Sequence, residues 1–183
     1  MLLSMLYRNF AINQGFTLSE VLIVLAIGAI LAGLAAPGFA SLRHNAALTA
    51  AADELLGALY LAQRSAARTG LPAVFCLTPD GGAQCVMGKN AAGTSWQVFL
   101  DLSASSALQP AGSGLRLRQS RLASGVQIRA TRPAVTFWPA ARAATTGTFT
   151  VCDSRDRSSA HAVIISETGR PRIAETEGGA CVF

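Results

Sequence analysis

Arginine is the residue type in this chain with the clearest binding chemistry. Of 15 basic residues only Lys89 is a lysine, and near the end of the sequence Arg170 and Arg172 flank Pro171 and follow Gly169. In an extended segment, side chains two residues apart project from one face, about 6.5 to 7 Å apart. That is close to the spacing of successive phosphates along one nucleic-acid strand. At this spacing, two guanidinium groups could engage neighbouring phosphates without reading bases.

Other arginines occur in a stretch that contains no acidic residue, between Asp101 and Asp153. This stretch holds six of them, namely Arg116, Arg118, Arg121, Arg129, Arg132 and Arg142. Arg155 and Arg157 follow it, and we expect them to extend a basic patch that attracts a polyanion. The alternative interpretation is that these arginines form only a solvated basic surface. In that case Arg170 and Arg172 are two solvated residues that flank a turn.

Four cysteines, Cys76, Cys85, Cys152 and Cys181, lie in the second part of the chain. An even number in an exported domain favours disulfide bonds over metal ligands. Three pairings are possible, and the turn-forming residues 80–82 between the first two cysteines favour Cys76 with Cys85, which leaves Cys152 with Cys181. Neither Cys-x-x-Cys spacing nor a nearby histidine indicates a metal site, so none is predicted.

Catalysis is the least supported class of function. The chain has two histidines, His44 and His161, and neither has a companion nucleophile or carboxylate at a suggestive spacing. A nucleotide-binding fingerprint is also missing from the sequence, so we expect neither an enzyme nor a cofactor. His44 is interpreted as a helix surface residue, and Trp96 and Trp138 as buried strand aromatics.

The first 40 residues indicate a membrane protein. From Phe16 to Phe39 the only charged residue is Glu20, and 24 helical residues can cross a hydrocarbon core about 30 Å thick. Arg8 precedes this run, and positive charge beside an apolar segment tends to stay cytoplasmic, which places the rest of the chain outside. The expected divisions are a leader at 1–15 and a transmembrane helix at 16–40.

The helix should continue as an amphipathic segment over 41–69, with a bend near Pro37. Gly70-Leu71-Pro72 is expected to end it. Its apolar positions recur at helical spacing: Leu42, Leu48, Leu55, Leu59 and Ala62 or Ala66. The remainder, 70–183, alternates turns with short runs typical of strands, at 73–77, 96–102, 115–118, 126–130, 134–138, 149–153, 162–166 and 170–174. We therefore predict an α+β fold shaped like a lollipop, in which a long helix packs on an antiparallel sheet or small sandwich.

The hexapeptide Gly15-Phe16-Thr17-Leu18-Ser19-Glu20 resembles the prepilin peptidase motif of type IV pilins and pseudopilins. The resemblance implies cleavage after Gly15 by that peptidase and methylation of the new N-terminal Phe16. It also implies that Glu20 offsets the N-terminal ammonium of a neighbouring pilin during assembly, since an unpaired charge in a bilayer is costly. The implied surroundings are the inner membrane, crossed once, a periplasmic domain and, after assembly, a pilus at the cell surface.

Four blocks of the domain, at 74–85, 96–102, 149–155 and 162–174, resemble the GspH/FimT family of type IV pilin-like proteins. The cysteines and Gly169-Arg170-Pro171-Arg172 are similar to those of FimT-type minor pilins, whose Gly-Arg-x-Arg motif is associated with DNA binding in natural transformation. The resemblance implies that Arg170 and Arg172 contact phosphates of double-stranded DNA non-specifically and that Gly169 forms the turn. Two other functions stay open: a FimU-like minor pilin that primes the pilus, and pseudopilin H of type II secretion.

Overall fold

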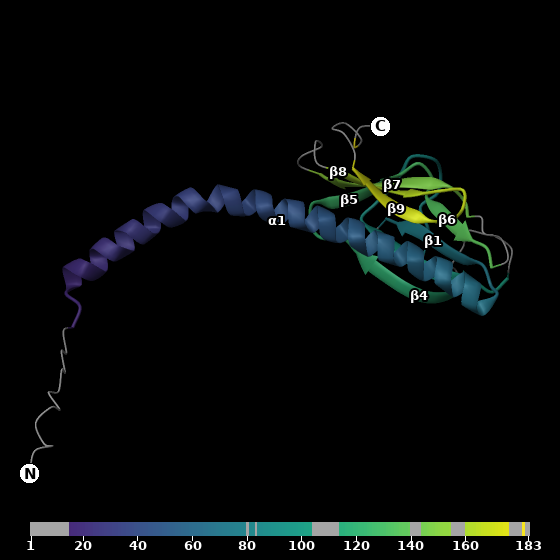
Figure 1. Cartoon of the computed structure of the whole chain (residues 1–183), viewed down its shortest axis with the longest axis horizontal. Coiled ribbons are helices and arrows are strands. Elements are labelled where there is room, and N and C mark those ends of the chain that lie inside the picture. The colour runs from purple at the N-terminus through teal and green to yellow at the C-terminus, as the bar shows by residue number, and fades with distance from the viewer. Residues whose placement is uncertain are drawn as a thin grey trace, which may run out of the picture. The chain divides into compact units, whose positions relative to one another are not determined.

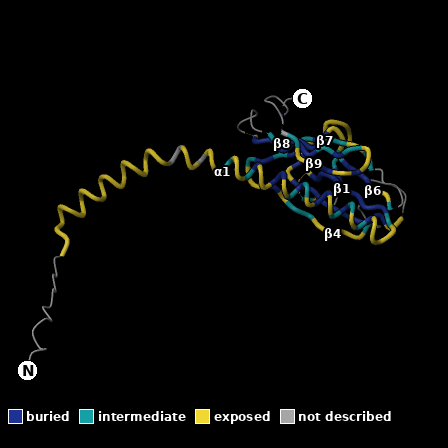
Figure 2. The backbone as a smooth tube through the Cα atoms, viewed as in Figure 1, coloured by how far each residue is buried: buried dark blue, intermediate teal, exposed yellow. Residues whose placement is uncertain are grey.

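The computed structural model describes residues 15–79, 81–82, 84–103, 114–139, 144–154, 160–175 and 181. The chain divides into two compact units, Met1–Ser41 and Leu42–Phe183. The described part of the first unit is almost entirely helical, and its residues 15–35, 38–39 and 41 are exposed (Figure 2). Within it, Leu18–Ala35 is long and apolar enough to cross a membrane.

A single helix, α1, runs from Leu18 to Thr69. It begins with a capping box, because Thr17 Oγ1 accepts a hydrogen bond from the Glu20 backbone NH at 3.3 Å and a Glu20 carboxylate oxygen accepts one from the Thr17 backbone NH at 3.0 Å. It ends where Gly70 adopts the left-handed region at φ +70 and its NH bonds to the Ala66 carbonyl. The helix of about 50 residues that ends at Gly70 is therefore confirmed.

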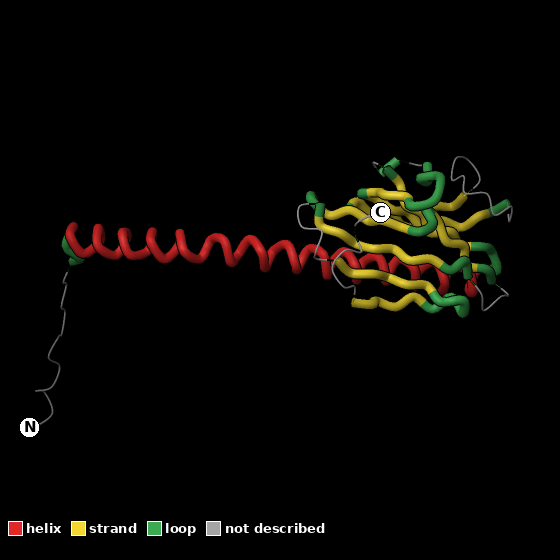
Figure 3. The backbone as a smooth tube through the Cα atoms, turned by 90° about the horizontal axis from the view of Figure 1, so that it is seen from above, coloured by secondary structure: helices red, strands yellow, loops and turns green. Residues whose placement is uncertain are grey.

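The C-terminal part of α1 supplies one layer of the core of the second unit. Its buried residues follow one another at intervals of one to four positions: Leu48, Ala51, Ala52, Leu55, Ala58, Leu59, Ala62 and Ala66. Most of these residues are alanines, and this part of the helix lies along the sheets in Figures 1 and 3. Leu42 was expected on the same face, but its side chain is exposed, because the buried stripe begins only at Leu48.

The strands form two antiparallel sheets. The four-stranded sheet has the order β4-β3-β1-β6 and the five-stranded sheet the order β2-β5-β7-β8-β9. The strands are β1 (Ala73–Thr78), β2 (Ala91–Gly93), β3 (Ser95–Asp101), β4 (Gly114–Arg121), β5 (Val126–Ala130), β6 (Ala134–Phe137), β7 (Gly147–Asp153), β8 (Ala160–Ile165) and β9 (Pro171–Glu175). The prediction of an α+β fold with antiparallel sheets is thus confirmed.

An aromatic cluster joins the two sheets at the centre of the unit. Phe75 of β1 packs edge-on against Phe149 of β7, with ring centroids 5.1 Å apart, and tilts against Trp96 of β3 at 5.8 Å. All three rings are buried, as was expected for Trp96. Trp138, expected to be buried as well, is 37% exposed, since it follows the end of β6 instead of lying within the strand.

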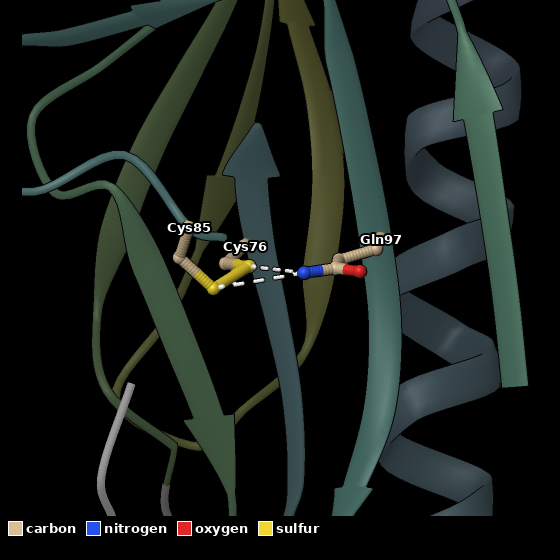
Figure 4. Close-up of a disulfide and its surroundings, with 3 residues drawn as sticks. All are labelled: Cys76, Cys85 and Gln97. Carbon is tan, nitrogen blue, oxygen red and sulfur yellow. Dashed lines mark hydrogen bonds between the residues drawn. A yellow bond between two sulfur atoms is a disulfide. The ribbon is translucent and has the colours of Figure 1, made fainter. Parts of the chain in front are cut away.

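Both disulfide bonds match the favoured pairing. Cys76 of β1 is bonded to Cys85, and Cys152 of β7 is bonded to Cys181. The first bond covers the face of the four-stranded sheet that points away from α1, where Val74, Phe99 and Ala134 complete a small second core. Figure 4 shows the buried Gln97 of β3 beside it, with its amide nitrogen 3.6 Å from Cys76 Sγ.

Candidate nucleic-acid interface

The arginine pair lies at a tight turn between β8 and β9. Within this turn, the Gly169 NH donates to the Ser166 carbonyl at 2.8 Å, and the Ser166 NH donates to the Arg170 carbonyl at 3.3 Å. The Ser166 hydroxyl also accepts a bond from the Arg170 NH at 3.3 Å. The predicted strand at 170–174 in fact begins at Pro171, because Arg170 still belongs to the turn.

Gly169 is required at its position for two reasons. Its φ of +73 lies in the left-handed region that side chains disfavour. In addition, a Cβ atom there would lie 3.3 Å from the Ala144 Cβ and 3.8 Å from the Gln63 amide nitrogen. Glycine thus lets the turn approach both the chain at Ala144 and the helix.

Replacing Gly169 by alanine tests this close approach, with Gly70→Ala as the matched control. Gly70 has nearly the same φ, +70, but open space where its Cβ would be. Gly70→Ala should therefore cost only backbone strain, about 1 kcal/mol, and Gly169→Ala should cost more because Ala144 must also shift. Thermal unfolding of the two variants measures the difference. Equal losses would contradict a packing role for Gly169.

Helix α1 holds the backbone of this turn in place. The Gln63 amide nitrogen donates to the Gly169 carbonyl at 3.1 Å, and the Tyr60 hydroxyl donates to the Pro171 carbonyl at 3.2 Å. These two bonds join residues more than 100 positions apart in the chain. The turn is consequently fixed on a rigid element, which reduces the ordering cost when its side chains bind a ligand.

The side chains of the turn point partly to solvent. Arg170 and Arg172 are exposed, and Pro171 between them is buried. Arg172 is paired with Ile164 of β8, so it lies on the outer face of the five-stranded sheet. Within the described part of the chain, neither guanidinium forms an ion pair or hydrogen bond. Arg155 and Arg157, which were predicted to extend this patch, lie outside the described residues.

The described arginines of the acid-free stretch are spread over both sheets. Arg116, Arg118 and Arg121 lie on β4, Arg129 on β5 and Arg132 in the β5–β6 connection, whereas Arg142 lies outside the described residues. Arg118 has an acidic neighbour from outside the stretch, because its guanidinium lies 3.8 Å from the Glu54 carboxylate of α1. Because Glu54 is distant in sequence, the sequence around Arg118 gave no indication of this ion pair.

Both histidines connect the helix to the five-stranded sheet. His44, a partly exposed residue of the helix surface, has its Nδ1 3.5 Å from an Asp153 carboxylate oxygen at the end of β7. Asp153 is buried, and a polar neighbour on the helix offsets the cost of burying it. His161 Nε2 lies 3.5 Å from the Thr49 hydroxyl. These contacts tie the start of the buried helix stripe to the ends of β7 and β8.

The comparisons with known proteins identify the family. The model of the family described as type II transport protein GspH matches residues 51–169, which is more than half of the chain. The chain belongs to the GspH family. A second model, the prokaryotic N-terminal methylation motif, matches residues 11–36. The GspH-family domain thus carries the processing and assembly segment of a membrane-anchored pilin, and prepilin peptidase and other pilins are its partners.

Solved structures place this GspH-family chain in the same fold group. The type IV minor pilin FimU of Pseudomonas aeruginosa, known in two crystal forms, is 18% and 19% identical, with a TM-score of 0.53 for each. The match covers 73% of this chain and 99% or 94% of the FimU chains. The minor pseudopilin EpsH of the Vibrio cholerae type 2 secretion system is 13% identical, with a TM-score of 0.49, over 69% of this chain and 95% of EpsH. No curated protein matches in sequence.

In this GspH-family chain, the residues predicted for processing and assembly lie at the start of α1. Gly15 and Phe16 are exposed, and Glu20 is exposed in the first turn. The Glu20 carboxylate accepts hydrogen bonds from both the backbone NH and the hydroxyl of Thr17, each at 3.0 Å. Thr17 was part of the recognised motif, but its partnership with Glu20 was not foreseen, although the T-x-x-E spacing is a helix-start signal.

Proposed function

We propose that this chain is a minor type IV pilin of the FimT kind that binds double-stranded DNA non-specifically for uptake in natural transformation. The observation that carries the proposal is the exposed pair Arg170 and Arg172 on a turn held by helix α1. Gly169 shapes the turn, and Arg155 and Arg157 are proposed to extend the surface. The chain would cross the inner membrane once, keep this domain in the periplasm and reach the cell surface in a pilus.

The proposed chemistry is electrostatic. Planar guanidinium groups bind phosphate with two parallel hydrogen bonds, and no ion pair to another described residue has to be broken first. Two to four such contacts support weak, sequence-independent binding, with a Kd of about 1 to 100 μM at physiological salt. Several subunits that engage one DNA molecule would bind more tightly through avidity.

The likeness in fold to FimU and the match to the GspH family model support two other roles. One is a minor pilin that primes pilus assembly, and the other is pseudopilin H of a type II secretion system. Neither role requires affinity for DNA. The first predicts that loss of the gene lowers the number of pili, and the second predicts retained export substrates.

The deciding experiment measures binding of the unit Leu42–Phe183 to labelled duplexes of unrelated sequence at two salt concentrations. This piece contains the whole described core, whose residues all lie from Leu48 onward. The double variant Arg170→Gln, Arg172→Gln should lose at least tenfold in affinity, because two phosphate contacts disappear. The parent should bind every duplex and weaken as salt rises.

The matched control is the double variant Arg116→Gln, Arg132→Gln, which removes the same charge from exposed positions elsewhere on the unit. It should weaken binding much less than the turn variant does. Equal weakening by both variants would leave only a general charge effect and overturn the role of the turn. If the parent fails to bind at low salt, the DNA role fails, and pilus priming or secretion becomes the better account.

A further inference from the structure

Arg64 of helix α1 directly follows Gln63, one of the two helix residues that bond to the turn carrying Arg170. Its side chain is exposed, and its guanidinium carbon lies 5.9 Å from the centre of the Tyr60 ring. The hydroxyl of that same tyrosine donates to the Pro171 carbonyl, and the residue before Arg64, Gln63, donates to the Gly169 carbonyl. An arginine of the helix is thereby brought next to the arginine turn, which follows it by about 100 residues in sequence.

We infer that Arg64 is a further phosphate contact, so that the binding site is composite and consists of one helix and one hairpin. The inference rests on the proposed DNA binding. Within the described residues, Arg64 forms no ion pair, so its charge is available to a ligand. The tyrosine ring restrains the guanidinium through a cation–π contact, which reduces the side-chain freedom that is lost on binding.

A composite site has a consequence for the ligand that it fits. Arg170, at the end of the turn, and Arg172, on β9, are two residues apart and could contact neighbouring phosphates of a single backbone. Arg64 projects from a separate element beside them, so it would reach phosphates that the hairpin arginines do not bind. Arg68, also exposed and one helical turn further along α1, lies on the same side of the helix and would extend this arm of the site.

The test uses the full chain in non-ionic detergent and a labelled duplex, titrated over a range of salt concentrations. Arg64→Gln should weaken binding about threefold to tenfold at low salt and reduce the slope of log K against log salt by about 0.9, the value for one phosphate contact. Arg132→Gln, which removes the same charge from the β5–β6 connection, is the matched control and should leave the slope nearly unchanged. Arg64→Lys should restore the slope, because it keeps the charge.

The outcomes separate the two claims. Binding by the parent with equal slopes for Arg64→Gln and Arg132→Gln would overturn the role of Arg64 and leave the proposed function standing. A parent that does not bind DNA would overturn both. Thermal unfolding of Arg64→Gln should match that of the parent, since the residue is exposed. A large loss of stability together with failure of Arg64→Lys to restore binding would also overturn the inference, because Arg64 would then act on the fold.

Discussion

Replacing Leu59 by alanine should destabilise the unit Leu42–Phe183 by about 3 to 5 kcal/mol. Leu59 lies on α1, is fully buried and contributes to the main core between the helix and the sheets. Shortening its side chain to a methyl group removes buried apolar surface and leaves a cavity that the close-packed neighbours cannot fill completely. Chemical denaturation monitored by circular dichroism measures the loss. A loss of this size would unfold a large share of molecules in a marginally stable domain.

Leu56→Ala is the control on the same helix. Leu56 is only partly buried and packs against the edge of that core, so the same chemical change should cost clearly less. Both substitutions place alanine in a helix, and their helix propensity terms therefore cancel. If the two variants lost equal stability, α1 would not supply a layer of the core as the structure has it.

The second large effect is expected from the disulfide between Cys152 and Cys181. These cysteines are 29 positions apart, whereas Cys76 and Cys85 are 9 apart. In the chain-entropy account, closing loops of these lengths contributes about 3.6 and 2.6 kcal/mol. All four cysteines are buried, so the two double alanine variants lose similar amounts of stability to cavities. The difference in stability between them therefore reflects the lengths of the two loops. The double variant Cys152→Ala, Cys181→Ala should therefore be the less stable of the two.

The longer loop also encloses β8, the arginine turn and β9. Loss of its disulfide should consequently loosen the strand that carries Arg172 more than loss of the other bond does. Hydrogen exchange of β9 amides in both double variants measures this. Slower exchange in the Cys152→Ala, Cys181→Ala variant than in the Cys76→Ala, Cys85→Ala variant would contradict the expectation.

Local patterns predicted most of the secondary structure, and the exceptions have physical causes. The helix end at Gly70 and the strand at 126–130 agree with the structure because cap residues and alternation are local signals. Strand β2, Ala91–Gly93, was missed, since three small residues have no alternation and become a strand only by pairing with β5. Strand β4 extends beyond the predicted 115–118 at both ends, because pairing with β3 sets its length.

Only those residues of the candidate site that are close together in sequence could be predicted. Gly169, Arg170 and Arg172 form a turn-and-strand pattern that can be recognised without a structure. The hydrogen bonds from Tyr60 and Gln63 to this turn could not be anticipated. The sequence of a helix does not indicate which distant backbone carbonyls its side chains will bind. Arg64 was overlooked for the same reason. Its place beside the turn depends on those two bonds.

The position of β9 in the chain determines the order in which the molecule can be completed during synthesis. Helix α1 emerges first, yet the strands that cover its apolar stripe follow over the next hundred residues, and its bonds to the Gly169 and Pro171 carbonyls must wait for the final hairpin. Until then the Leu48–Ala66 stripe lacks its complete cover. The chain is therefore made and exported with this apolar stripe incompletely covered, and a chaperone that protects the stripe should bind α1 and leave when β9 docks.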